Sequence, residues 1–459
     1  MAPDVVVVGA GNAGLCAAIS ARRTGASVLL LERSPEDVRG GNTRHTRDIR
    51  HAHAESLPSA PGVYAEEEFL ADLEGVSNGT QDRELARLVV EESAGLPAWM
   101  ERHGIRWQPQ LRGALHLSRT NSFFLGGGKA LLNAYYDAAT TLGVEVAYST
   151  CLEGIEAGAR DGVALRVSGP GAREIRASAV VLAAGGFEAN LEWLRRYWGD
   201  AVDHYIVRGS PYNDGSVLAL LGELGAATVG DPRGFHAVGV DARSPRFDGG
   251  IVTRVDATPY GIALNASGRR FADEGENLWP KRYASWGRLI AEQPGQTAYA
   301  LVDAKVRPLF IPSVYPPLEA GSIAELAGLL GLDPATVTDT VAEFNAHTDP
   351  DGHFDPGVLD GLATRGLTPP KSNWALPLDT PPYAAYPLRP GITFTYMGVR
   401  VDRDCRVLLD DGAPIPGVYA AGELMAGNVL TKGYLAGIGL TIGSVSGIRA
   451  GREAAHHAR

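Results

Sequence analysis

The segment VVVVGAGNAG, residues 5–14, decides the fold class of this chain. Four consecutive valines are typical of a short, buried strand of a parallel sheet. The GxGxxG pattern follows at once, residues 15–23 are predicted to form a helix, and a second apolar run at residues 27–31 ends at Glu32. A strand, a glycine-rich turn, a helix and a second strand that ends in an acidic residue make up the β-α-β unit that binds dinucleotides.

Each part of this unit has a physical role. Gly9 permits the tight turn, Gly11 lets the backbone approach a pyrophosphate, and Gly14 lets the helix pack closely on the strand. The free N–H groups and the dipole at the helix N-terminus attract phosphate groups. Glu32 can accept hydrogen bonds from a ribose diol. The expected contacts also include Asn12, Ala13 and Arg33.

Two later segments combine a short apolar strand with small residues, namely VVLAAGGF at residues 180–187 and GVYAAGE at residues 417–423. Small side chains at the end of a strand allow the backbone to lie against a flat cofactor. No second β-GxGxxG-α unit is found in the sequence, so only one bound dinucleotide is expected. The expected contacts from these segments are Ala183, Ala184, Gly185, Gly422 and Glu423.

This three-part pattern resembles that of the FAD-binding flavoproteins. GGNT at residues 40–43, NDG at 213–215 and GRRFADE at 268–274 resemble the fumarate reductase/succinate dehydrogenase flavoprotein superfamily. Within that superfamily, the segments closest to FAD-dependent tricarballylate dehydrogenase are GNTRHTR at 41–47, ITFTY at 392–396 and KGYLAG at 432–437. The segment at 434–439 is also similar to 3-ketosteroid Δ1-dehydrogenases.

The resemblance extends over nearly the whole chain and implies an α/β fold, in which a Rossmann-like FAD-binding domain carries an inserted α+β capping domain. A chain of 459 residues is also too long for a single core. The change to Pro-rich loops and short helices places the capping domain at residues 234–375, between two parts of the FAD-binding domain at 1–233 and 376–459. Predicted helices lie at residues 130–142, 323–330 and 334–345, and a predicted loop at 349–370.

The same resemblance implies further contacts with FAD. Some related flavoprotein subunits attach FAD covalently to a histidine near residue 45. Here Thr43, not His45, aligns with that position, so non-covalent FAD is expected. The remaining expected FAD contacts are Gly41, Asn42, Thr43, Leu152, Asp214, Gly439 and Leu440.

Composition excludes several classes of protein. The net charge of −11 argues against a nucleic acid or an anionic membrane surface as the main partner. The three cysteines are widely spaced and form no CxxC pair, so neither a disulfide framework nor a metal site is expected, and a reducing cytoplasm is favoured. No apolar run reaches the ~18 residues that a membrane-spanning helix needs. The N-terminus has no basic region or cleavage site of a signal peptide.

The resemblance also implies which residues carry out catalysis. Fumarate reductases use a histidine at the start of the capping domain, and His236 matches it. The arginine that they place a few residues after the motif ending at Glu274 is replaced here by Leu278 or Trp279. Arg282, ahead of Lys281, is therefore expected to enter the site as the cation. Alternatively, His236 is a hydrogen-bonded interior histidine, and Lys281 and Arg282 are solvated basic residues of the capping domain.

The expected substrate-binding side also departs from the fumarate reductase pattern. Phe394 and Thr395, and further on Tyr434, stand where a histidine and an arginine bind the substrate, which argues against a plain C4-dicarboxylate site. Tyr434 offers a phenol as acid, base or hydrogen-bond donor, or else it is a core tyrosine bonded to the backbone. Arg254 is expected to hold a substrate carboxylate. A dense basic cluster also favours an anionic substrate, or else contacts the FAD phosphates; it comprises Arg44, His45, Arg47, Arg50, His51 and His53.

Two classes of function remain. The first is an FAD-dependent dehydrogenase (desaturase) or reductase that acts on a C–C bond next to a carboxylate or ketone, with a tricarballylate-like acid as substrate and a 3-ketosteroid as the alternative. The second is a flavoprotein subunit that works with an iron–sulfur partner. Either one needs a separate electron acceptor, which could be a quinone, an iron–sulfur protein or oxygen.

Overall fold

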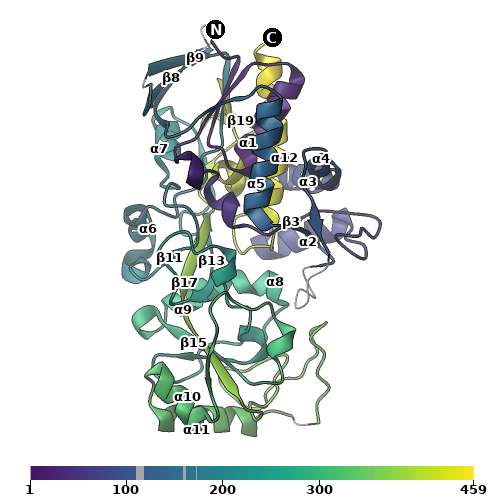
Figure 1. The fold of residues 1–459 in the computed structure, drawn as a ribbon, viewed down its shortest axis with the longest axis vertical. Coiled ribbons are helices and arrows are strands. Elements are labelled where there is room, and N and C mark those ends of the chain that lie inside the picture. Colours follow the sequence, from purple (N-terminus) through teal and green to yellow (C-terminus); the bar gives the residue numbers. More distant parts are fainter. Residues whose placement is uncertain (1, 110–117, 159–161, 172, 350) are drawn as a thin grey trace.

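A six-stranded sheet forms the centre of the upper half of the molecule in Figure 1. The computed structural model describes residues 2–109, 118–158, 162–171, 173–349 and 351–459. The five strands from β20 to β6 run parallel, and β19 pairs antiparallel with β20. In sheet order the strands are β19 (Arg406–Leu408), β20 (Pro414–Ala420), β10 (Ala179–Leu182), β1 (Val5–Val8), β2 (Val28–Leu31) and β6 (Glu145–Ala147).

Three helices lie side by side next to this sheet, namely α1 (Asn12–Thr24), α5 (Gly127–Thr141) and α12 (Ile438–His457) (Figure 1). Helices α1 and α12 approach each other closely because α12 has glycines at the contact. A Cβ atom at Gly447 or Gly451 would lie 2.3 or 2.1 Å from a carbonyl oxygen of α1. The N-terminal helix is thereby locked to the C-terminal one, and both chain ends lie at the same end of the molecule.

Smaller elements surround this core. An antiparallel sheet contains β7 (Cys151–Gly158), β8 (Gly162–Ser168) and β9 (Arg173–Ala177). A second one contains β3 (Asp48–Arg50), β5 (Asn121–Phe124) and β4 (Trp107–Gln108). The remaining elements of this half are α2 (Glu66–Ser77), α3 (Arg83–Ser93), α4 (Leu96–Glu101), α6 (Leu191–Trp198), α7 (Ser216–Glu223), and the pair β12 (Thr228–Val229) and β18 (Gly398–Val399).

A second mixed sheet builds the lower half and is organised around one long strand, β17 (Tyr383–Thr395) (Figure 1). The other strands are β11 (Ile206–Val207), β13 (Phe235–Asp241), β14 (Ile262–Asn265), β15 (Ala298–Val302) and β16 (Leu318–Ala320). The helices of this half are α8 (Trp279–Arg282), α9 (Trp286–Ala291), α10 (Ile323–Leu330) and α11 (Pro334–Ala346). This half has hydrophobic clusters of its own, as an inserted capping domain requires.

The α/β fold with a capping domain is confirmed, and most predicted elements form. The predicted helix at 323–330 is α10, and those at 130–142 and 334–345 match α5 and α11 to within a few residues. The described part of 349–370 contains no helix or strand, and residue 350 lies outside the described residues. The sheet of the lower half reaches beyond 234–375, because β11 and β17 belong to it.

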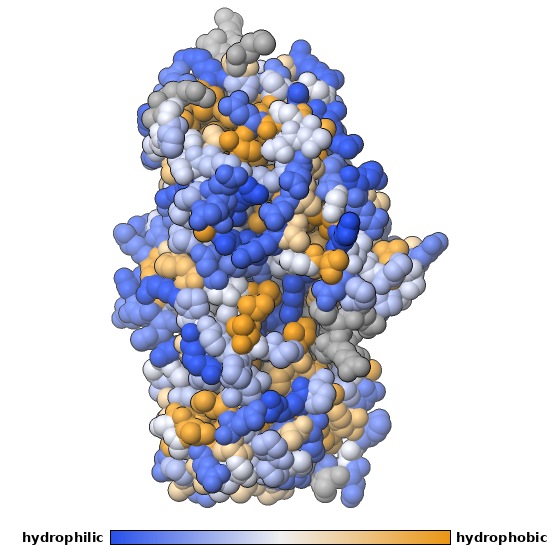
Figure 2. Space-filling model, viewed as in Figure 1, coloured by the Kyte–Doolittle hydropathy of each residue, from blue (hydrophilic) through white to orange (hydrophobic). Residues whose placement is uncertain are grey.

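The surface offers no single dominant apolar face in Figure 2, where hydrophobic residues lie in several separate groups. Within the described ranges, no helix is long and apolar enough to cross a membrane. Those same ranges contain no group of three or more His, Cys, Asp or Glu side chains that could hold a metal ion. Cys16, Cys151 and Cys405 are free thiols.

Candidate FAD and substrate site

One cavity runs along the carboxyl ends of β1, β2, β10 and β20, where ligands bind in open α/β sheets. It gathers every cofactor contact expected from the sequence except Gly14. The expected residues that line it are Gly9, Gly11, Asn12, Ala13, Glu32, Arg33, Gly41, Asn42, Thr43, Leu152, Ala183, Ala184, Gly185, Asp214, Gly422, Glu423, Gly439 and Leu440.

Two glycines shape the turn between β1 and α1. Gly9 has a φ of +93°, in the region that favours glycine, and an added Cβ would lie 2.5 Å from the carbonyl oxygen of Ala183. Gly14 lies behind the cavity wall, where a Cβ would lie only 1.8 Å from the carbonyl oxygen of Gly9. Gly14 thus acts through the close packing of helix on turn, as its place in the pattern predicted, and not by lining the cavity.

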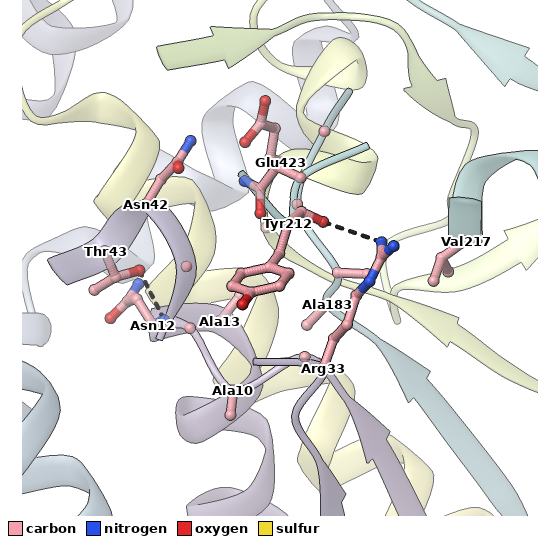
Figure 3. Close-up of a pocket in the computed structure, with 18 of the residues that line it drawn as sticks. Ala10, Asn12, Ala13, Arg33, Asn42, Thr43, Ala183, Tyr212, Val217 and Glu423 are labelled. Atoms are coloured by element: carbon pink, nitrogen blue, oxygen red, sulfur yellow. Dashed lines mark hydrogen bonds between the residues drawn. The ribbon is translucent and has the colours of Figure 1, made fainter. Parts of the chain in front are cut away.

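The N-terminus of α1 is suited to a phosphate group. Its N-cap residue is Gly11, so no N-cap side chain bonds to the N–H groups of the first turn, and that turn contains no acidic residue. The Asn12 N–H donates to Thr43 Oγ1 at 3.0 Å (Figure 3), and the Asn12 amide donates to the Leu440 carbonyl at 3.2 Å. The helix end therefore has no acidic residue and no side-chain cap of its own, which fits the pyrophosphate of FAD.

At the end of β2, the buried Glu32 accepts from the Ala10 N–H at 3.1 Å and from the Ser34 N–H at 2.9 Å. Arg33 forms an ion pair with Asp214 at 2.6 Å and donates to the Tyr212 carbonyl at 3.3 Å (Figure 3). These contacts fix the acidic residue at the strand end, where the ribose of a dinucleotide is held in β-α-β units.

His45 lies outside the cavity, while Thr43 lines it. The His45 Nε2 atom is 2.6 Å from Asp248 Oδ1, and burial lowers the pKa of this histidine despite the nearby carboxylate. This side chain is therefore engaged by Asp248 and does not point to the cofactor cavity.

Two carboxyl groups form a pair at the cavity wall, where Glu423 lines the cavity and the buried Glu188 lies behind it. The Glu423 carboxylate accepts from the Thr395 N–H at 2.7 Å and from the Thr395 hydroxyl at 3.1 Å. Glu188 accepts from the side-chain amides of Asn42 and Asn213. Burial raises the pKa of both carboxyls, and the Glu188 charge raises that of Glu423 further. The two groups therefore hold a proton above the pH at which a free glutamate releases it.

The structure places Thr395 against this pair. Its hydroxyl accepts from the Phe187 N–H at 3.2 Å and donates to Glu423, and the residue is fully buried. Its hydroxyl thus binds the carboxyl pair, and Thr395 does not line the cavity. Its neighbour Thr393 lines the cavity instead.

His236 and Tyr434 meet at the other end of the cavity. Their rings stack at a centroid distance of 3.9 Å and an interplanar angle of 11°. Tyr434 lines the cavity, and its phenol oxygen accepts from the Gly439 N–H at 3.1 Å. His236 is 3% exposed, and its Nδ1 atom has no hydrogen-bond partner. Tyr434 therefore has a hydrogen bond to the backbone, as the alternative interpretation of a core tyrosine predicted. His236 has an unpaired Nδ1 atom, so it does not match the alternative of a hydrogen-bonded interior histidine.

Two buried arginines, Arg208 and Arg254, lie near this aromatic pair, and a third, partly buried arginine, Arg47, joins them through Asp256. Arg254 binds Asp256 through two contacts, at 2.6 and 2.8 Å, and lies over the ring of Tyr283. Arg47 reaches the same carboxylate at 3.5 Å. We call Arg47, Arg208 and Arg254 the arginine cluster.

The aromatic residues near the cluster stay uncharged. Burial, together with the charges of Arg208 and Arg254, keeps the pKa of His236 well below its ordinary value, so the imidazole is neutral at pH 7. Burial raises the pKa of Tyr434, and that of Tyr283 to about 12. The site therefore presents neutral rings and fixed positive charges.

Arg208 was not anticipated, because it precedes a turn motif and belongs to no local pattern. Burial, with help from the charge of Arg254, lowers its pKa to about 10, so it remains protonated at pH 7. Its Nε atom donates to Thr393 Oγ1 at 2.8 Å, which links the cluster to the cavity wall.

The structure does not bring Arg282 and Lys281 to this cavity. Both lie in α8 and line a second cavity that is also bordered by α2. Lys281 forms an ion pair with Asp72 at 2.5 Å, and Arg282 pairs with Glu276 and Ser285. The reason is the orientation of α8, whose Trp279 turns inward and donates to Asp256 Oδ1 at 2.7 Å while the two basic side chains point elsewhere.

The basic cluster at residues 44–53 is also divided by the fold. Only Arg47 belongs to the arginine cluster. Arg50 is buried and donates to the Ala436 carbonyl and to the Tyr64 hydroxyl, and His51 contacts the Ser122 hydroxyl at 2.8 Å. Alternation along β3 directs neighbouring side chains to opposite faces.

Comparisons with known proteins agree with this geometry. The family of the FAD binding domain matches residues 4–440. NADH:fumarate oxidoreductase of Klebsiella pneumoniae (strain 342) is 27% identical over 99% of this chain and 48% of its own length. 4-Oxocyclohex-2-ene-1-carboxylate 5-dehydrogenase of Sinomonas cyclohexanicum is 28% identical over 99% of this chain and 94% of its own. The chain thus spans about half the length of the first relative and nearly all of the second.

Solved structures show the same fold. The open conformation of a flavocytochrome c3 fumarate reductase superposes with a TM-score of 0.77 at 23% identity, covering 99% of this chain and 78% of the other. The family match, the cavity at the sheet edge and the shared fold lead to one conclusion. This chain belongs to the FAD binding domain family and is an FAD-binding flavoprotein.

Proposed function

We propose that this protein is an FAD-dependent dehydrogenase, or reductase, that acts on the C–C bond next to a carboxylate of a small organic acid with several carboxylates, such as a tricarballylate-like substrate. The observation that supports this most is the arginine cluster, which places buried positive charge beside the cofactor cavity. A buried cation without a full complement of anions is unfavourable, so the site favours an anionic ligand.

The flavin, when bound, supplies a group that accepts or returns a hydride. Arg254 and Arg47, oriented by Asp256, bind and polarise the substrate carboxylate, which makes the hydrogen on the adjacent carbon more acidic. Arg254 thereby takes the cationic role that was expected of Arg282. The stack of His236 on Tyr434 positions the substrate between the cluster and the cavity.

We assign the proton exchange to Tyr434. Burial raises the pKa of this phenol, so the resting side chain holds its proton, while the Gly439 N–H bond to the phenol oxygen and the nearby charge of Arg208 partly offset that rise. Tyr434 is also the titratable side chain that lines the cavity at this end. Removing a group that transfers a proton typically lowers the rate by about 10²–10⁴-fold.

The first test is anaerobic bleaching of the flavin by a panel of tricarballylate, succinate and a 3-keto steroid. We expect tricarballylate to bleach it fastest. In the Tyr434→Phe variant the rate should fall by about 10²-fold or more with the flavin spectrum intact, whereas Tyr260→Phe, a control in the capping domain, should keep the rate. Bleaching by the steroid alone would refute the proposal and favour the 3-ketosteroid reaction, to which an uncharged substrate and Tyr434 are suited.

FAD is held without a covalent bond, because Thr43 lines the cavity and His45 is engaged by Asp248. Acid precipitation should therefore release one FAD per chain, and flavin that stays in the precipitate would contradict this.

The free thiols favour a cytoplasmic location. Reoxidation needs a separate acceptor, either a quinone, oxygen or an iron–sulfur protein, and co-purification of an iron protein would favour the subunit alternative.

A further inference from the structure

We propose that Arg208 determines the substrate specificity of this site by binding a second carboxylate of the substrate, beyond the one held by Arg254. This inference rests on the proposed function and refines it, because it assigns separate arginines to separate carboxylates.

The backbone and one hydroxyl fix Arg208 in place. It follows β11, and its N–H donates to the Ile392 carbonyl of β17 at 2.8 Å. Its Nε atom donates to Thr393 Oγ1 at 2.8 Å, and Thr393 lines the cofactor cavity. The guanidinium group is therefore fixed directly behind Thr393 at the wall of the cavity, which Arg208 itself does not line.

Arg208 differs from its neighbours in its lack of an anionic partner. Asp256 is already shared by Arg254, Arg47 and the indole N–H of Trp279. Among the residues that the structure describes, no ion pair involves Arg208, which is 4% exposed and whose NH1 atom has no hydrogen-bond partner. Such a buried, protonated group is stabilised when a ligand brings an anion to it.

The geometry of the unpaired atom indicates the chemistry of that ligand. Since Thr393 occupies the Nε side of the guanidinium, the edge formed by the two terminal nitrogens is left for a carboxylate, which can bind it through two parallel hydrogen bonds. The planar fork of arginine suits this arrangement better than the point charge of lysine. A substrate that satisfies both Arg254 and Arg208 needs at least two carboxylates.

The test compares two ligands that differ in one charge, succinate and its monoamide succinamate, together with tricarballylate. For each, the KM and kcat of flavin reduction and the Kd from the shift of the flavin absorbance are measured in the wild-type holoenzyme and in Arg208→Gln. We expect the Kd and KM of succinate and tricarballylate to rise ten- to a hundredfold in the variant, and those of succinamate to change less than threefold, with kcat nearly constant for all.

Three further variants separate charge, position and general damage. Arg208→Lys should restore only part of the affinity, because the fork is lost. Thr393→Val, which keeps the arginine but frees its Nε atom, should raise the KM of the two polyacids selectively and to a smaller extent. Arg233→Gln, which removes an arginine with a largely exposed side chain, should change none of these values.

Each outcome is decisive. If Arg208→Gln weakens succinate and succinamate equally, or weakens neither, Arg208 does not bind a second carboxylate and the inference is wrong. If Arg208→Gln does not retain FAD, Thr393→Val and Arg208→Lys give the answer, and an unchanged ratio of succinate to succinamate affinity in both overturns the inference. Failure of the proposed function is seen separately, as wild-type flavin that responds to none of the acids.

Discussion

Replacing Gly14 with alanine should damage both the fold and FAD binding, although Gly14 does not line the cavity. The added Cβ would lie 1.8 Å from the Gly9 carbonyl oxygen and 2.9 Å from the Gly9 carbonyl carbon, whereas ordinary contact begins at 3.4 Å. The start of α1 would have to move away from the turn by more than 1 Å, since the Gly9 N–H is anchored to the Leu31 carbonyl at 2.8 Å. Overpacking of this kind costs about 1–3 kcal/mol, and the anchored backbone places Gly14→Ala near the upper end.

A matched substitution measures what alanine does where there is room. Gly328 lies on the exposed face of α10, and an added Cβ atom there would have no other atom within 4 Å. Gly328→Ala should therefore be neutral or stabilising by about 0.5–1 kcal/mol, because alanine loses less backbone entropy than glycine in a helix. The two variants add the same methyl group, so their difference reports the collision alone.

The assay is thermal unfolding together with the ratio of flavin to protein absorbance. At roughly 2 °C per kcal/mol for a large domain, a loss of ~3 kcal/mol lowers the Tm of Gly14→Ala by about 6 °C. Its FAD content should fall well below one per chain, because the displaced helix end no longer presents its N–H groups to the pyrophosphate. A Gly14→Ala protein with full FAD content and the Tm of Gly328→Ala would refute the reasoning.

Three other predictions concern charged groups. Glu32→Ala should weaken FAD binding by about 1.5–3 kcal/mol for each hydrogen bond lost to an ionised acceptor, and an unchanged Kd of the apoprotein for FAD would contradict the assigned role. Burial raises the pKa of Glu188 and Glu423 above the ordinary value of 4.5 for a glutamate, so the native protein holds a proton that the unfolded chain releases. The free energy of unfolding should therefore fall as the pH rises above 4.5 through the native pKa. In urea titrations between pH 5 and 8, Glu188→Gln should make that fall shallower, because its amide replaces the protonated carboxyl. Parallel curves of stability against pH for the two proteins would exclude the shared proton. Asp256→Asn should destabilise the protein by about 3–5 kcal/mol, because it leaves Arg254 buried without its carboxylate. Added tricarballylate should recover part of the lost Tm. A Tm that does not recover would argue against an anionic ligand.

The sequence by itself determined the cofactor half of this protein. The strand, turn and helix at residues 5–24 form as predicted, and the expected contacts from segments as distant as Glu32, Gly185 and Glu423 line one cavity. The physical reason is that dinucleotide binding depends on backbone approach, which glycines and small residues encode locally, and on the edge of a parallel sheet, where all strand ends meet.

Only the tertiary structure decided which charged side chains gather near the cofactor cavity. Arg47, Arg208 and Arg254 come from three separate segments, and no local pattern says that one aspartate serves two of them while Arg208 has none. The sequence placed Arg282 and Lys281 beside the site, but the inward turn of Trp279 sends them to another cavity. The charge balance of a buried site is a property of packing between distant segments, since each charge is satisfied or left unpaired only by the neighbours that the fold brings to it.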